Sequence, residues 1–178
     1  DGMPLIWASK VQGPPLLPER VAGSSMTISL CERASERGLS IYLLGGDEGV
    51  AERASEVLTK RHPGIQIAGY HCPPFGFEKN AQQMDTIRDG LAAASPDIVL
   101  VALGSPKQEK LIRDIRSVCP NACWIGVGIS LSFITGDVAR APEWVQKAGI
   151  EWMHRLIQEP KRLFRRYIIQ GIPWGLRL

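Results

Sequence analysis

Four short apolar runs, each linked to the next by a stretch with helical spacing, constrain the fold of this chain more than any other feature. The runs occupy residues 41–44, 65–70, 97–103 and 123–128, and their nearly continuous apolar character is typical of strands covered on both faces. Strands that alternate with helices predict an α/β fold: a Rossmann-like, doubly wound, mostly parallel sheet with right-handed crossovers. The predicted helices cover residues 24–37, 47–61, 79–94 and 107–118.

The pattern changes after Gly136, where the sequence becomes helical and basic without a further strand. Glycine and proline divide this tail into short pieces, at Pro142, Gly149, Pro160 and Pro173. We therefore expect a Rossmann-like domain over residues 1–140 and a helical appendage over residues 141–178.

The positive charge of the chain is concentrated in this tail. Residues 144–178 hold seven Lys or Arg and two Glu, a balance of +5, so the +3 of the whole chain leaves −2 for residues 1–143. Such local basicity indicates an anionic partner at the C-terminus, and we expect no nucleic-acid partner.

A helix over residues 159–170 combines apolar and basic side chains. Its apolar residues fall on one side, at Leu163, Phe164, Tyr167 and Ile168. They are flanked by Lys161, Arg162, Arg165 and Arg166. This pattern is typical of a helix that lies on an anionic membrane surface. It also fits a helix that packs on its own domain or on a partner subunit, so a homo-oligomer stays open.

The cysteines and the hydropathy point to a cytoplasmic protein. No CxxC pair is formed by Cys31, Cys72, Cys119 and Cys123, so we expect free thiols in a reducing compartment. A zinc site built from Cys119, Cys123, His71 and Cys72 is the alternative. No signal peptide is visible, and no apolar run approaches the ~18–20 residues of a transmembrane helix.

Two glycine-rich turns follow predicted strands, where open α/β sheets bind their ligands. Gly45, Gly46 and Asp47 lie between a strand and a helix, whose N-terminal amides are suited to a phosphate. Gly126 and Gly128 follow the last strand in the same way. Both turns match the dinucleotide fingerprint GxGxxG only in part, since Leu44 and Leu131 occupy glycine positions. Tight turns without a ligand are the alternative.

A third turn, "LGSPKQEK" at residues 103–110, carries more polar chemistry than a loop needs. Glycine permits close backbone approach, and proline suits the first turn of a helix. A cation and a side-chain amide on that first turn are suited to a diphosphate and a sugar hydroxyl. The residues concerned are Gly104, Ser105, Pro106, Lys107 and Gln108. A solvated helix face at Lys107, Glu109 and Lys110 is the alternative. No DxD motif offers a carboxylate pair to a metal ion, and we expect neither metal nor cofactor.

Several segments together resemble the WecG/TagA/CpsF family of bacterial glycosyltransferases over essentially the whole chain. They read "DGMPLIWA", "ERVAGS", "YLLGGDEGVAERA", "LGSPKQEK" and "RAPEWVQKAGIEWMHRLIQEPKRLFRRY". The resemblance implies metal-independent, inverting transfer of a sugar from a UDP-sugar to an undecaprenyl-diphosphate-linked saccharide. It implies a peripheral location on the inner face of the cytoplasmic membrane, with the C-terminal appendage closing over the site.

The same resemblance assigns roles to individual residues. Asp1 matches the candidate general base, which would take the proton of the acceptor hydroxyl. Arg20 matches an arginine near the substrate and Gln108 matches the family glutamine, so both are catalytic candidates beside Asp1. Arginines of the appendage would neutralise diphosphate charge: Arg155, Arg162 and Arg165, with Arg166 beside them at the membrane.

The chain also departs from the family pattern. Family members usually extend upstream of "DG" with another strand and helix, so we expect this chain to be partial. Ser132 stands where the family often has an acidic residue. Two rival classes stay open: a dinucleotide-dependent Rossmann enzyme and a catalytically silent membrane-docking module.

Overall fold

The computed structural model describes residues 3–19, 21–158 and 160–164. These residues divide into two compact units. The larger unit comprises Gly23–Ala139, and the smaller one joins residues of 1–22 to residues of 140–178.

The described part of the larger unit contains a four-stranded parallel sheet in the order β2-β1-β3-β4. The strands are β1 (Ser40–Gly45), β2 (Gln66–His71), β3 (Ile98–Ala102) and β4 (Cys123–Gly126). Each agrees with a predicted run to within two residues at either end, and the predicted parallel α/β architecture is confirmed. The central strands β1 and β3 are buried along almost their whole length.

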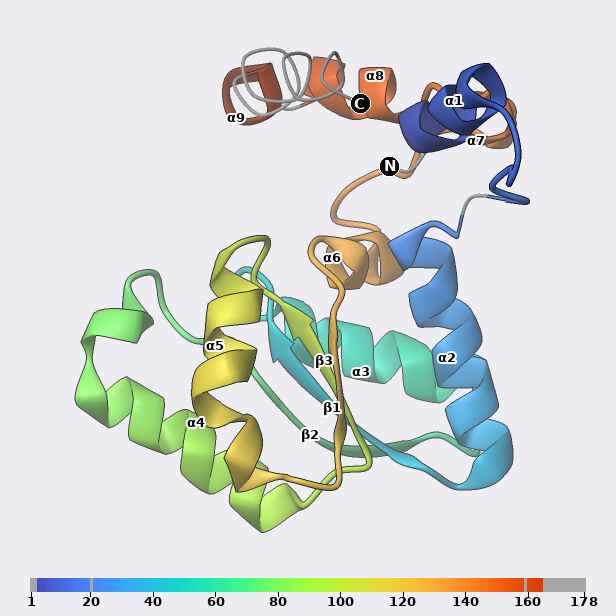
Figure 1. Cartoon of the computed structure of the whole chain (residues 1–178). Helices are drawn as coiled ribbons and strands as arrows, with labels where there is room; N and C mark the ends of the chain where they lie inside the picture. Colours follow the sequence, from blue (N-terminus) through green and yellow to red (C-terminus); the bar gives the residue numbers. More distant parts are fainter. Residues whose placement is uncertain (1–2, 20, 159, 165–178) are drawn as a thin grey trace. The chain divides into compact units, whose positions relative to one another are not determined.

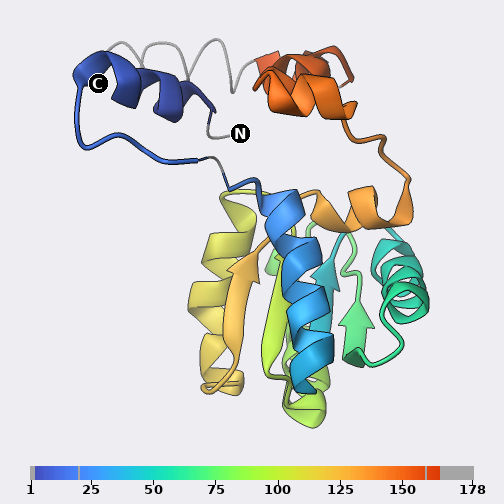
Figure 2. The ribbon, with the colours of Figure 1, turned by 90° about the vertical axis from the view of Figure 1, so that its right-hand side faces the viewer.

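Helices cover both faces of this sheet (Figures 1 and 2). Their bounds are α2 (Gly23–Arg37), α3 (Val50–Arg61), α4 (Ala81–Ala94), α5 (Lys107–Ile115) and α6 (Ser130–Thr135), with the 3₁₀ turns η1 (Phe77–Lys79) and η2 (Arg116–Val118). On one face α2, α3 and α6 pack around Leu43 and Leu100. On the other face α4 and α5 pack around Leu44 and Val101. Alternate residues of each central strand thus serve opposite cores, as the pleat requires.

The pairing register between the edge strand β2 and β1 shifts at one point. Ile41 pairs with Ile67, but the next residue, Tyr42, pairs with Gly69. This β-bulge places one extra residue in β2. Gly69 is required there because a Cβ would lie 2.7 Å from the Tyr42 ring. The aromatic ring therefore lies across the backbone of β2.

The smaller unit is helical, as predicted for the tail. It contains α1 (Met3–Gln12), α7 (Glu143–Lys147), α8 (Glu151–Gln158) and α9 (Pro160–Phe164). Met3 packs on Gly149, where a Cβ would lie 2.6 Å from the methionine methyl group. Helix α1 was not predicted, because a short apolar stretch without flanking strand signals has no distinctive period. The predicted helix over 159–170 is described only at residues 160–164.

Candidate functional site

The three turns selected in the sequence follow β1, β3 and β4, and they lie side by side at the carboxyl ends of these strands. Parallel strands end on the same side, and the register pairs Gly45 with Ala102 and Val101 with Gly126. The glycine-rich turn after β1 therefore lies beside the turn after β3, which lies beside the turn after β4. The chemistry of the three turns differs.

The turn after β1 is packed tightly against β3. Gly45 has a φ of 103°, and a Cβ there would lie 2.7 Å from the carbonyl oxygen of Ala102. The N–H of Gly46 donates to the same oxygen at 2.7 Å. Asp47 follows with an exposed side chain, and its carbonyl accepts from Val50 N–H. The glycines of this turn serve internal packing.

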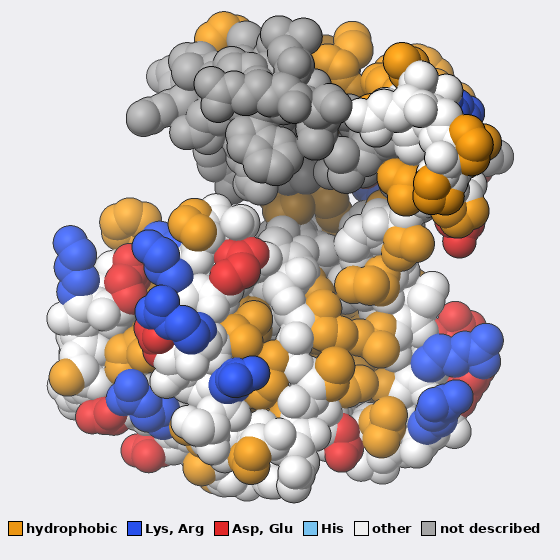
Figure 3. Space-filling view, viewed as in Figure 1, with side chains coloured by type: hydrophobic (Ala, Val, Ile, Leu, Met, Phe, Trp, Pro, Cys, Tyr) orange, Lys and Arg blue, Asp and Glu red, His pale blue; other side chains and the backbone are white. Residues whose placement is uncertain are grey.

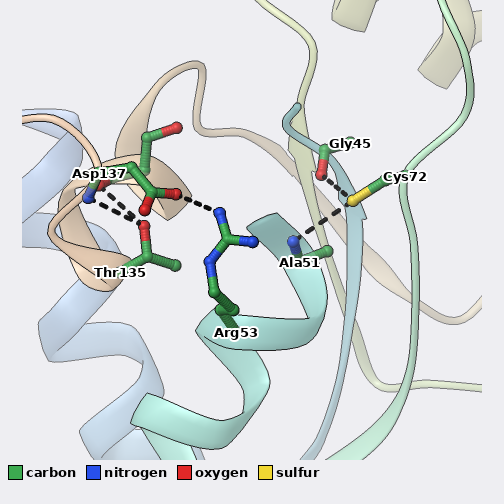
Figure 4. Close-up of polar contacts among 7 residues, drawn as sticks. Gly45, Ala51, Arg53, Cys72, Thr135 and Asp137 are labelled. Atoms are coloured by element: carbon green, nitrogen blue, oxygen red, sulfur yellow. Dashed lines mark hydrogen bonds and ion pairs between the residues drawn. The ribbon is translucent and has the colours of Figure 1, made fainter. Parts of the chain in front are cut away.

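Cys72, which directly follows β2, contacts the first turn of α3 (Figure 4). Its sulfur accepts the N–H of Ala51 at 3.3 Å and donates to the carbonyl of Gly45 at 3.4 Å. The cysteine thus satisfies an amide in the first turn of the helix, the role usually filled by a capping oxygen. The sequence offered no signal for this contact, because Cys72 lies 21 residues from Ala51.

An ion pair fixes the same helix from its other side (Figure 4). The Arg53 guanidinium of α3 lies 2.6 Å from the carboxylate of Asp137, just beyond α6. This hydrogen bond from Arg53, together with the neighbouring Thr135 side chain, lowers the pKa of Asp137. The pair joins α3 to the segment that follows the turn after β4.

The turn after β3 has an open backbone. Gly104 has a φ of 73°, and among the described residues no atom beyond its chain neighbours lies within 4 Å of the position of a Cβ. The following Ser105–Pro106 peptide is cis. No acceptor for the N–H of Ser105 or Lys107 is found in the described part of the chain. The open side of Gly104 distinguishes this turn from the one before α3, where a Cβ at Gly45 or Gly46 would meet neighbouring atoms at 2.7 and 2.9 Å.

Lys107 extends toward the loop between β2 and α4. Its ammonium lies 3.2 Å from Glu78 and 4.5 Å from the centroid of the Phe75 ring, which is 99% exposed. The pKa of Glu78 is lowered by its own backbone N–H and by Lys107. The lysine predicted to contact a diphosphate is therefore held by a carboxylate and an aromatic face.

Gln108 connects the turns after β3 and β4. Its side chain is only 8% exposed, although it lies in the first turn of α5. The side-chain Oε1 accepts the N–H of Gly128 at 3.1 Å, and Nε2 donates to Glu109 at 3.0 Å. Gly128 has a φ of 55°, and around it, as around Gly104, the described residues leave the Cβ position open.

The other predicted residues lie away from the three turns or outside the described part of the chain. Asp1, Arg20, Arg165 and Arg166 lie outside the described residues. Arg155 lies in α8 and Arg162 in α9, without a description of either side chain. Ser132, which stands where the family often has an acidic residue, is buried within α6.

The alternative zinc site does not form. His71 and Cys72 lie at the carboxyl end of β2, whereas Cys123 begins β4 at the opposite edge of the sheet. The Cys119 thiol donates to the carbonyl of Leu91. Within residues 3–19, 21–158 and 160–164, no three His, Cys, Asp or Glu side chains group as a metal site would require. The same residues include no helix with the length and apolar character needed to span a membrane.

Charges of both signs are interspersed on the surface of α4 and α5 (Figure 3). They form local ion pairs, such as Arg88 with Asp85 and Arg113 with Asp114. This face of the larger unit therefore carries no single-sign field that would attract a polyanion.

The whole chain, residues 1–178, matches the model of the glycosyl transferase WecG/TagA/CpsF family. The chain belongs to this family. It is 35% identical over 162 residues to the N-acetylglucosaminyldiphosphoundecaprenol N-acetyl-beta-D-mannosaminyltransferase of Bacillus spizizenii. That match covers 91% of this chain and 60% of the relative, so the chain spans less than two thirds of the relative's length. The family resemblance seen in the sequence is thus confirmed, and the residue roles carried over from WecG/TagA/CpsF proteins stay predictions.

Proposed function

We propose that this chain is the greater part of a glycosyltransferase that moves a hexose-type sugar from a UDP-sugar to an undecaprenyl-diphosphate-linked saccharide. The reaction belongs to the synthesis of a cell-surface polysaccharide or teichoic acid. Membership of the WecG/TagA/CpsF family supports glycosyl transfer, and the name of the Bacillus spizizenii relative supports a lipid-diphosphate acceptor.

The observation that carries the proposal is the open backbone after β3. Among the described residues no acceptor is found for the N–H groups of Ser105 and Lys107, which lie beside Gly104, and the open side of that glycine leaves room for a ligand. Backbone donors at the start of a helix stabilise phosphate oxygens, and they would stabilise the charge that develops on the UDP leaving group. We therefore place the donor diphosphate at the turns after β3 and β4, with the turn after β1 as their packed support.

The transfer is an inverting single displacement that does not use a metal ion. Asp1 acts as general base: its carboxylate takes the proton of the acceptor hydroxyl while that oxygen attacks the anomeric carbon. The bond between the anomeric carbon and UDP breaks, and UDP leaves with the electron pair. Arg20 acts near the substrate, and Arg155, Arg162 and Arg165 supply counter-charge to the two diphosphates. These five roles rest on the family resemblance.

The enzyme works as a peripheral protein at the inner face of the cytoplasmic membrane, with its appendage on the anionic surface. Exposed apolar side chains on the C-terminal helices support this placement: Trp144, Ile157 and Phe164. Basic residues near such a surface contribute about 1 kcal/mol each. Replacing Arg165 and Arg166 together by Ala should weaken binding to phosphatidylserine vesicles at least tenfold, with the pair Lys60 and Arg61 as control. Unchanged binding by the first variant would remove these arginines from the membrane contact.

A donor screen tests the activity directly. The chain is incubated with a short-chain lipid-diphosphate GlcNAc acceptor and a panel of UDP-sugars that includes UDP-N-acetylmannosamine. We expect transfer from one UDP-sugar without added metal, and loss of transfer in Asp1→Asn with UDP binding intact. A silent docking module would bind vesicles and turn over no donor.

Calorimetry with UDP and NAD separates the remaining rival. A dinucleotide enzyme would hold its pyrophosphate at the turn after β1. There, however, the backbone is packed: a Cβ at Gly45 would lie 2.7 Å from the carbonyl oxygen of Ala102, and one at Gly46 would lie 2.9 Å from the Val50 side chain. We expect binding of UDP and none of NAD; the reverse result would contradict the proposal.

A further inference from the structure

We propose that Gln108 is a positioning residue, which binds the donor indirectly by fixing the turn after β4 against the start of α5. The inference rests on the proposed function and assigns Gln108 a role other than direct recognition of the sugar. The turn concerned comprises Val127, Gly128 and Ile129, between the end of β4 and the start of α6.

The side chain of Gln108 is turned into the protein. At 8% exposure it offers little surface to a ligand. Its carbonyl oxygen accepts from Gly128, 20 residues away in the sequence, and its amide nitrogen donates to the adjacent Glu109. The only side-chain oxygen of Gln108 is thus bonded to the backbone of the neighbouring turn.

Gly126 shows how closely the two elements approach. A Cβ at this residue would lie 2.4 Å from Nε2 and 2.8 Å from Cδ of Gln108. The φ of Gly126 is not left-handed, so its backbone conformation suits other residues as well. Glycine is needed there because the Gln108 amide passes directly over it.

The hydrogen bond between Gln108 and Gly128 fixes the distance between the turn after β3 and the turn after β4. Gly128 holds a left-handed φ of 55°, and its N–H is fixed by Gln108. The backbone N–H of Gln108 itself donates to Gly104 at 3.0 Å. One residue therefore links both open glycines, Gly104 through its main chain and Gly128 through its side chain. A ligand that spans the two turns requires this spacing to be fixed in advance.

Two variants remove the contact by different routes. Gln108→Met keeps the length of the side chain and deletes its acceptor, whereas Gly126→Ala displaces the unaltered Gln108. Gln82→Met makes the same exchange at an exposed position of α4 and serves as control. Gly126→Ala is also made in a Gln108→Ala background, where the added methyl has no amide to displace.

Each variant is examined by hydrogen exchange of the Gly128 amide without ligand and by calorimetry with UDP. Loss of one hydrogen bond predicts roughly five- to tenfold faster exchange at Gly128 and a similar loss of UDP affinity in Gln108→Met and Gly126→Ala. Gln82→Met should match the parent, and Gly126→Ala should add less than twofold to Gln108→Ala.

The outcomes are distinct. Lower UDP affinity with unchanged Gly128 exchange would mean that Gln108 contacts the donor itself, and faster exchange with unchanged affinity would give it a structural role alone. Either result overturns the inference. A parent chain that binds no UDP overturns the proposed function, and the inference with it.

Discussion

Gly104 and Gly126 are both glycines for physical reasons, but the reasons differ. Gly126 accommodates a neighbouring side chain, the Gln108 amide. Gly104 adopts a φ of 73°, which L-residues with a Cβ rarely adopt, and the described residues leave its outer side open. The first is a packing requirement. The second combines a conformational requirement with room for a ligand.

Gly104→Ala separates these effects. The left-handed conformation should cost about 1–2 kcal/mol of unfolding free energy, and the new methyl group should also lower UDP affinity. Gly38 has a φ of 65° and precedes the amino end of β1, away from the three turns. Gly38→Ala should therefore cost similar stability and leave UDP affinity intact. Urea unfolding and calorimetry measure the two quantities. Equal UDP affinity in both variants would place the donor elsewhere.

At the scale of residues, the sequence predicted the polar positions of the site but not the partners that their side chains contact. The spacing of "LGSPKQEK" was enough to select Gly104 and Gln108, because strand ends and helix starts are local patterns. The partners of Lys107 and Gln108 could not be predicted, since Glu78 and Gly128 become neighbours only once the sheet order is fixed. Sequence alone therefore identified the polar turn without showing that Lys107 extends away from it.

At the scale of elements, the strands were predicted more accurately than the helix starts. Buried strands show as apolar runs, but α3 begins at Val50, three residues later than expected. The delay follows from the left-handed conformations of Gly45, Gly46 and Gly49, which extend the turn. In the same way, Asn80 caps α4 through its side chain and separates it from η1.

The start of α3 provides a test at this scale. Cys72→Ala removes the acceptor of the Ala51 amide and should lower the unfolding free energy by about 1 kcal/mol. Cys72→Ser restores a donor and an acceptor and should recover part of that loss. Cys123→Ala, at the exposed first residue of β4, should stay within about 0.5 kcal/mol of the parent. A Cys72→Ala variant as stable as the parent would show that the thiol contact contributes nothing.

For the whole molecule, the carboxylates predict loss of stability in acid. Asp97 joins β1 to β3 by accepting the N–H and the hydroxyl of Ser40, both at 2.8 Å, and these bonds lower its pKa. The pKa of Asp137 is also lowered, chiefly by its hydrogen bond from Arg53. Because the folded pKa lies below the unfolded value of about 4, the contribution is present above that pH and is lost as pH falls through the folded pKa.

We therefore expect unfolding free energy to decline below about pH 4. Asp97→Asn should be less stable than the parent at pH 7, and the gap between the two should narrow in acid. Urea titrations at pH 7 and pH 3 measure this difference. Parallel losses of stability in both proteins would show that Asp97 does not contribute to the acid sensitivity.

The extra residue in β2 affects how chains of this kind can be compared. Ile67 and Cys72 are five positions apart, so strict alternation would place them on opposite faces, yet both pack against the α3 side of the sheet. The bulge shifts the phase of the strand, and a relative one residue shorter here would present a different side chain to the start of α3. A single-residue gap in an alignment of β2 therefore exchanges which residues at the carboxyl end of the strand face α3 and which face the opposite side of the sheet. Substitutions beyond that point are comparable only between sequences that share the bulge.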